Sequence, residues 1–168
     1  MALSGSDVTS TYMNARLILE LVNLFCAGML AGTEFVTHTV FRAPIKALEA
    51  PSQIRFRQAV TLKLRALVPA LFFPTALSGI AIAILDRSAP GATLRGAGVA
   101  AALLWIAIRA VGTIPINAAT LDWNPEAPPT NWRAQLQRAE QLHTIGLWLA
   151  VGMFALFLAA EALRLSGR

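Results

Sequence analysis

Four long apolar stretches, separated by shorter polar segments, divide the chain. They cover residues 15–40, 66–85, 96–121 and 142–163. A helix rises about 1.5 Å per residue, so about 20 residues cross the roughly 30 Å hydrocarbon layer of a bilayer. The pattern therefore predicts an all-α integral membrane protein, a four-helix transmembrane bundle in which residues 1–168 form a single domain.

The composition supports this interpretation. Hydrophobic residues make up 56% of the chain and charged residues only 14%, which is too apolar for a soluble domain of 168 residues. The net charge is +5, but no aromatic-basic motif accompanies the Lys and Arg residues, which lie beside the apolar stretches. Membrane lipids, and not nucleic acid, are the expected partners. We expect a multi-pass protein of a bacterial inner (plasma) membrane.

The distribution of basic residues predicts an orientation. Residues 41–65 carry six Lys or Arg residues, and Arg133 and Arg138 of the third loop lie on the same side. The opposite side has five basic residues: Arg16, Arg87, Arg95, Arg164 and Arg168. Because short loops rich in Lys and Arg tend to stay in the cytoplasm, both termini are expected to lie outside.

Polar residues gather on one side of the first stretch. At about 100° per residue, they fall together with two alanines within an arc of about 80°. Ionisable groups inside a membrane are costly, and they persist where they face a bundle interior and mark a functional path. This stripe is therefore predicted to form the inner wall of a site; its polar members are Glu20, Asn23, Glu34 and His38.

Gly28 and Gly32 of the same stretch form a GxxxG pair, with Ala27 and Ala31 beside them. Such small residues allow another helix to approach closely. The pair fits ordinary packing within the bundle, and it also fits a contact between copies of the chain, so we expect a homo-oligomer.

The third stretch contains Arg109, a basic residue far from either end of the stretch. Its guanidinium is expected to reach the interface or to neutralise a carboxylate on a neighbouring helix, either Glu20 or Glu34. Pro115 should disturb the helix just before Asn117, which would turn the Asn117 amide toward the bundle axis.

Successive spans alternate in direction, so the end of the first span, the end of the third and the start of the fourth share one side of the membrane. Arg109 is expected about 12 Å deeper than this level, at about 1.5 Å per residue. Both histidines of the protein belong to the predicted set: Glu34, His38, Asn117, Glu140 and His143.

Three interpretations of this set stay open. Bundle cores build transition-metal sites from two Glu-x-x-His pairs and further Glu residues, and here only Glu140 to His143 fits that pattern. A polar pocket with a His or Glu proton-transfer base needs fewer residues. A hydrogen-bond network that only holds the helices together is the third. The candidate metal ligands are His38, His143, Glu34 and Glu140.

Several short motifs of the chain resemble the anthrone oxygenase family of small four-helix membrane proteins. Ala31-Gly32 and Pro44 are similar to the first helix and loop of that family. Gly146 stands where the family usually has an arginine, and Glu140 where it often has an aromatic residue. The motifs of the C-terminal half are Ile114-Pro115-Ile116-Asn117, Leu121, the proline-rich turn, Trp132-Arg133 and Leu142-His143-Thr144.

The resemblance implies oxygenation of an activated aromatic methylene, from an anthrone to an anthraquinone, with O2 and no obvious organic cofactor. Deprotonated anthrone reacts with O2 directly, so the protein need only supply a base, hydrogen-bond donors and an apolar slot. In that mechanism His143 or Glu34 is the base, while Asn117 and Arg109 stabilise negative charge. Two alternatives remain: a non-catalytic subunit of a larger membrane complex, or a haem- or metal-binding protein that uses His38 and His143.

Overall fold

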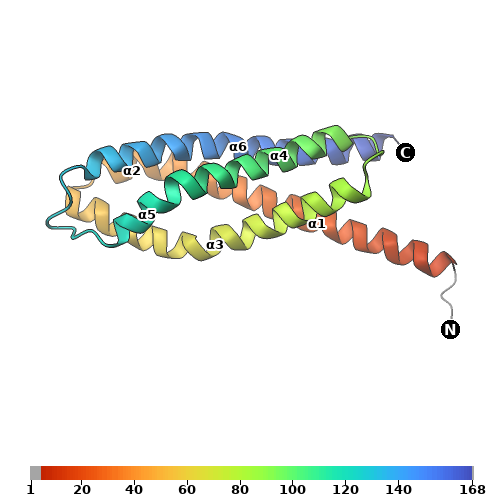
Figure 1. Ribbon diagram of the computed structural model, residues 1–168, viewed down its shortest axis with the longest axis horizontal. Coiled ribbons are helices and arrows are strands. Elements are labelled where there is room, and N and C mark those ends of the chain that lie inside the picture. Colours follow the sequence, from red (N-terminus) through yellow and green to blue (C-terminus); the bar gives the residue numbers. More distant parts are fainter. Residues whose placement is uncertain (1–4, 168) are drawn as a thin grey trace.

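The computed structural model describes residues 5–167, which form one elongated bundle of four long helices (Figure 1). The all-α four-helix bundle predicted from the sequence is confirmed. Both ends of the described chain lie at the same end of the bundle (Figure 1). The elements are α1 (Gly5–Val36), η1 (Thr37–Phe41), α2 (Arg42–Lys46), α3 (Ala50–Leu85), α4 (Ala92–Ile108), η2 (Arg109–Thr113), α5 (Ile114–Leu121) and α6 (Trp132–Ser166).

Four helical segments are long and apolar enough to cross a membrane, so the chain is a multi-pass membrane protein. Each overlaps a predicted span, but α3 already begins at Ala50 and α6 at Trp132, so both helices continue beyond the apolar stretches on the side of the basic residues. Large apolar side chains stay exposed on the outside of the bundle, as expected where lipid replaces water. The segments are Met13–Lys46, Ala50–Leu85, Ala92–Leu121 and Trp132–Ser166.

The core lies where α4 and α6 pack along their length, with α1 between α3 and α6. Trp105 is almost fully buried and stacks on Phe72, with ring centroids 5.2 Å apart and 20° between the ring planes. Gly28 lies against Phe154 of α6, whereas nothing in the described chain lies within 4 Å of a Cβ placed on Gly32. Gly28 thus serves packing inside the chain, whereas Gly32 does not. The homo-oligomer stays a prediction.

The bundle end formed by residues 122–131, here called the loop end, is closed by apolar side chains and one amide. Gln58 Nε2 donates to the backbone oxygens of Thr120 at 3.0 Å and of Trp123 at 2.9 Å. These bonds fix the third loop to α3. Beside them lies a small buried cluster of Ile54, Trp123, Trp132 and Leu136.

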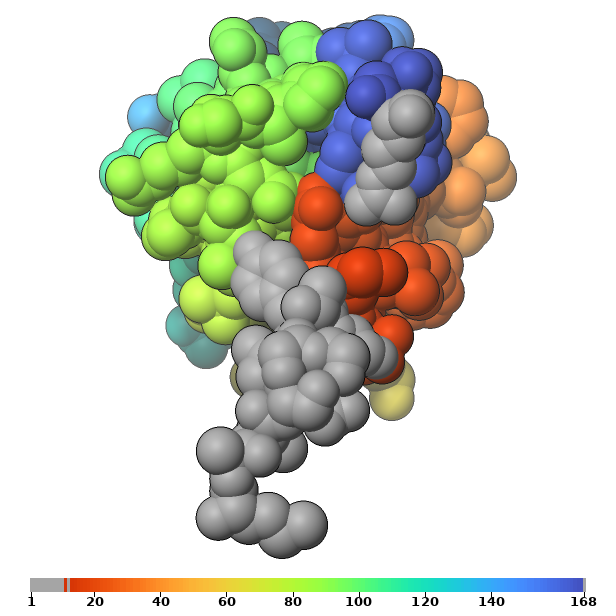
Figure 2. All heavy atoms as spheres, turned by 90° about the vertical axis from the view of Figure 1, so that its right-hand side faces the viewer, coloured from red at the N-terminus to blue at the C-terminus, as the bar shows by residue number. Residues whose placement is uncertain are grey.

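Figure 2 shows the opposite end of the bundle, where α1, α4 and α6 meet. Six charged side chains pair with one another at this end. Arg164 Nη2 lies 3.0 Å from Glu20 Oε2, and Arg95 Nη2 lies 3.4 Å from Glu161 Oε2. Glu20 is not the partner of Arg109, because it is held at this end by arginines from three helices. We call this group the end cluster; it consists of Arg16, Glu20, Asp86, Arg95, Glu161 and Arg164.

Candidate functional site

A second buried charged group lies nearer the loop end, and we call it the central cluster. It joins Glu34 of α1, Arg109 at the start of η2 and His143 of α6. Arg109 makes an ion pair with Glu34, and its Nη1 lies 2.5 Å from His143 Nδ1. Glu34 and Arg109 are 8% and 6% exposed, and His143 is half-buried. All three residues were predicted from the sequence as site residues, and Arg109 contacts each of the other two.

Aromatic and small residues shape the space for the guanidinium of Arg109. The guanidinium carbon lies 4.8 Å from the ring centroid of Trp105, in a cation–π arrangement. A Cβ placed on Gly146 would lie only 2.9 Å from Arg109 Nη2. Glycine at position 146 therefore leaves the room that the charged group occupies.

The contact between Arg109 and His143 determines which nitrogen of the imidazole carries hydrogen. Arginine has no hydrogen-bond acceptor, so His143 Nδ1 must accept and the ring hydrogen lies on Nε2. A neutral imidazole also avoids a second positive charge beside the guanidinium. In this state His143 offers an N–H donor, and Glu34 is the member of the central cluster that can accept a proton.

Two π-helical turns flank the central cluster. η1 begins three residues after Glu34, and η2 begins at Arg109 itself. Such turns are rare in proteins overall, and those that occur are often found at functional sites. Pro44 and Pro115 follow these turns closely. A proline lacks an N–H and crowds the carbonyl of the residue four positions earlier. For both prolines that residue lies inside the π turn. The prolines are the only sequence signal for this feature.

Deletion of Val111 is expected to leave the bundle folded. Val111 lies in η2 and is 81% exposed. A π turn holds one residue more than an α turn, so its removal restores an α-helix and keeps both flanking segments facing their partners. A thermal melt in detergent should show a Tm within a few degrees of the wild type. Deletion of Leu103 from the regular helix α4 is the control, because it rotates one flank by about 100° and should prevent folding; equal losses from both deletions would contradict the argument.

Glu140 lies one turn before His143 on α6, but it faces other partners. Its carboxylate binds Lys46 at 2.8 Å, Arg57 at 2.7 Å and Arg42 at 3.3 Å. From the sequence pattern alone, no role was predicted for these three cations other than their positive charge. The signal that could have identified them is the excess of basic residues in 41–65, opposite a buried acid on α6.

The candidate metal ligands are not assembled as a ligand set. Glu34 and Glu140 each bind cations, and His143 Nδ1 accepts from Arg109. His38 is half-buried one turn beyond Glu34 and lines a surface hollow with Arg42 and Lys46. Within residues 5–167 there is no group of three or more His, Cys, Asp or Glu side chains that could hold a metal ion. A bound metal or haem stays a prediction.

Arg109 and Asn117 differ from their expected positions. Arg109 was expected about 12 Å deeper than Glu34 and His143, but it contacts both. Asn117 lies on α5, two turns nearer the loop end, and no hydrogen bond joins it to the central cluster in the described chain. The reason is the stagger of α4 relative to α1 and α6, which residue counting does not give.

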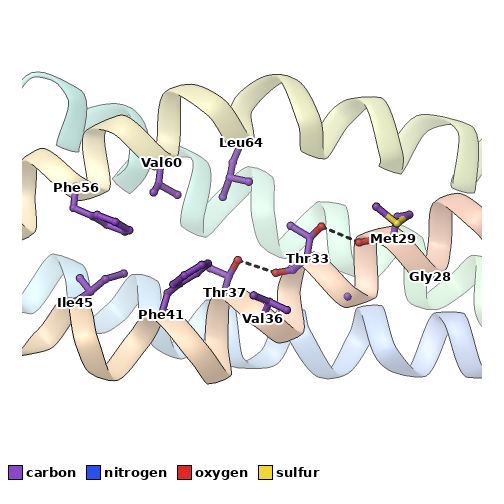
Figure 3. Close-up of a pocket in the computed structure, with 11 residues that line it drawn as sticks. Gly28, Met29, Thr33, Val36, Thr37, Phe41, Ile45, Phe56, Val60 and Leu64 are labelled. Atoms are coloured by element: carbon purple, nitrogen blue, oxygen red, sulfur yellow. Dashed lines mark hydrogen bonds between the residues drawn. The ribbon is translucent and has the colours of Figure 1, made fainter.

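An apolar groove runs between α1 and α3 (Figure 3) and has a volume of about 460 Å³. The hydroxyls of Thr33 and Thr37 donate to the helix's own carbonyls at 2.8 and 2.7 Å, so its walls are effectively apolar. Gly32 lines the groove and lies about 160° around α1 from Glu34. The groove and the central cluster are therefore on opposite sides of α1.

Toward the loop end the packing around the central cluster changes. α4 packs along α6, whereas the shorter α5 that continues it packs mainly on α3. His143 is half-buried at this level.

Comparison of the chain with models of protein families, with characterised proteins and with solved structures finds no match. The function of the protein is therefore inferred from the chemistry of the central cluster and from the motifs of the sequence.

Proposed function

We propose that the protein is a membrane-embedded oxygenase that acts on a lipophilic activated aromatic of the anthrone type with O2. The observation that carries the proposal is the contact of Glu34, Arg109 and His143 inside an apolar bundle. Together they supply a carboxylate base, a fixed cation and a neutral N–H donor in a site of low polarity. Electrostatic stabilisation of a developing anion is strongest in such surroundings.

The reaction needs one proton acceptor and one site for negative charge. The Glu34 carboxylate takes a proton from the substrate methylene, and the charge spreads to the substrate carbonyl oxygen, which accepts from His143 Nε2–H. The carbanion forms a C–O bond with O2 and gives a peroxide, which takes the proton back from Glu34. Loss of water leaves the second carbonyl, so one methylene and one O2 give one carbonyl and one water.

The resemblance to the anthrone oxygenase family supports the same role for Arg109. That family usually carries an arginine at the position of Gly146. Here Gly146 has no side chain, and the guanidinium of Arg109 fills the space beside it. A cation therefore lies next to His143 in this chain too, but it is Arg109, which comes from a different helix.

Oxygen uptake with anthrone tests the proposal. Purified protein in nanodiscs should consume one O2 for each anthraquinone formed, and Glu34→Gln should lower the rate at least 100-fold, within the usual contribution of a general base. Glu126→Gln removes a carboxylate from the exposed third loop and should leave the rate unchanged. Absence of uptake above the protein-free rate would contradict the proposal, and a Soret band or a stoichiometric metal would instead support the haem or metal alternative.

We further propose that the loop end faces the cytoplasm of a bacterial cell and that the chain forms a homo-oligomer. The loop end carries eight basic and four acidic residues, a surplus typical of cytoplasmic loops. The open space at Gly32 leaves room for a close helix contact between copies.

A further inference from the structure

Three cations converge on one carboxylate at the loop end. Glu140 of α6 binds Arg42 and Lys46 of α2 and Arg57 of α3, at 3.3, 2.8 and 2.7 Å. A single acid neutralises only one of them, so the group keeps two positive charges in excess. We call these four residues the basic group.

The geometry leaves donors of the basic group free for a ligand. The side chains of Arg42 and Lys46 are 38% and 51% exposed, while that of Glu140 is 11% exposed. An arginine has five N–H donors and a lysine three, far more than one carboxylate can accept. Arg42 and Lys46 line a hollow of about 450 Å³, together with His38, Thr39 and Ala43.

The basic group lies at the depth of the lipid headgroups. Arg42 follows the apolar stretch 15–40 by two residues, and Glu140 precedes the stretch 142–163 by two residues. The hydrocarbon layer therefore ends at this level, and the next layer outward contains lipid phosphates. Basic pockets between helices on the cytoplasmic side are suited to anionic headgroups.

Residues 41–46, which contain Arg42 and Lys46, also offer an apolar surface for an acyl chain. Phe41 and Ile45 line the apolar groove between α1 and α3, where Figure 3 shows them facing Phe56 and Val60. Arg42 and Lys46 are the next residues and line the hollow. We propose that the basic group binds the phosphate of an anionic phospholipid, with an acyl chain of that lipid in the part of the groove between Phe41, Ile45, Phe56 and Val60.

Lipid titration of the full chain in detergent tests the site. Phosphatidylglycerol should raise the Tm by several degrees, whereas phosphatidylcholine and inorganic phosphate should not. The double variant Arg42→Gln/Lys46→Gln should bind phosphatidylglycerol about 30-fold more weakly, because each cation near anionic lipid contributes roughly fivefold. The matched control is Lys63→Gln/Arg65→Gln, which removes two exposed cations of α3 outside the basic group and should change the affinity less than about threefold.

Three results would overturn the proposal. Stabilisation by inorganic phosphate alone would indicate a site for free anions. An equal loss in the control variant would indicate a general effect of surface charge. No shift with phosphatidylglycerol would remove the site, and none of these results depends on oxygenase activity.

Discussion

Arg109→Met is expected to destabilise the bundle by about 3–5 kcal/mol, because it leaves the Glu34 carboxylate buried without its cation. Glu34→Gln should be costly for the opposite reason, since the guanidinium then has no counter-charge. Both effects can be measured by reversible unfolding in mixed micelles. Glu126→Gln is again the control, since Glu126 pairs with Arg55 on the exposed surface, where such pairs contribute about 0–1 kcal/mol.

The double variant Glu34→Gln/Arg109→Met separates stability from chemistry. It contains no buried charge at this site, so most of the lost stability should return. The oxygenase rate should stay at the level of Glu34→Gln, because the base is still absent. A double variant as unstable as the sum of the two single variants would show that the residues do not act as a pair.

Arg95→Met is the second change with a large expected effect. Arg95 lies between Glu20 and Glu161, and its side chain is 5% exposed. Without it, the three carboxylates of the end cluster share only Arg16 and Arg164, and the expected loss of stability is again about 3–5 kcal/mol. The reaction rate of the protein that stays folded should not change, because the central cluster lies several turns away along the bundle.

Arg87→Met is the matched control for Arg95→Met. Arg87 is exposed in the turn between α3 and α4, so its loss should shift the unfolding free energy by less than about 0.5 kcal/mol. Equal effects of the two substitutions would show that the end cluster does not hold the helices together.

The sequence predicted which residues face inward better than it predicted their partners. Helical periodicity placed Glu20, Asn23 and Glu34 on one stripe, and all three are buried. It left Glu20 and Glu34 as equal partners for Arg109, because the choice depends on the axial stagger of α1 and α4. Periodicity within one helix contains no information about that stagger.

Other features depend on contacts between distant segments. From their positions near the ends of apolar stretches, Arg95 and Arg164 were predicted to be loop charges. Both are instead enclosed in the end cluster. The π turn that begins at Arg109 alters the helical geometry over one turn. Pro115 was the only signal for it in that part of the sequence. The three cations that bind Glu140 come from segments 83 to 98 residues earlier in the chain, so the spacing of residues on α6 did not predict them, and the excess of basic residues in 41–65 was the signal for them.

The apolar layer between the end cluster and the central cluster has an electrical consequence. Glu20 and Glu34 are 14 residues apart on α1, or about 21 Å along the helix. Asn23 lies about one turn from Glu20 and donates to the Thr75 carbonyl and to Ser78 Oγ, but the side chains of α1 that are buried between Asn23 and Glu34 are all apolar. Protons and ions therefore find few polar groups to step across in this part of the bundle. In the proposed mechanism, a proton at Glu34 is therefore expected to exchange with the compartment at the loop end, and the acidity of that compartment would set the reaction rate. The interior of the layer is filled by side chains at most 1% exposed: Ala27, Leu30, Trp105 and Met153.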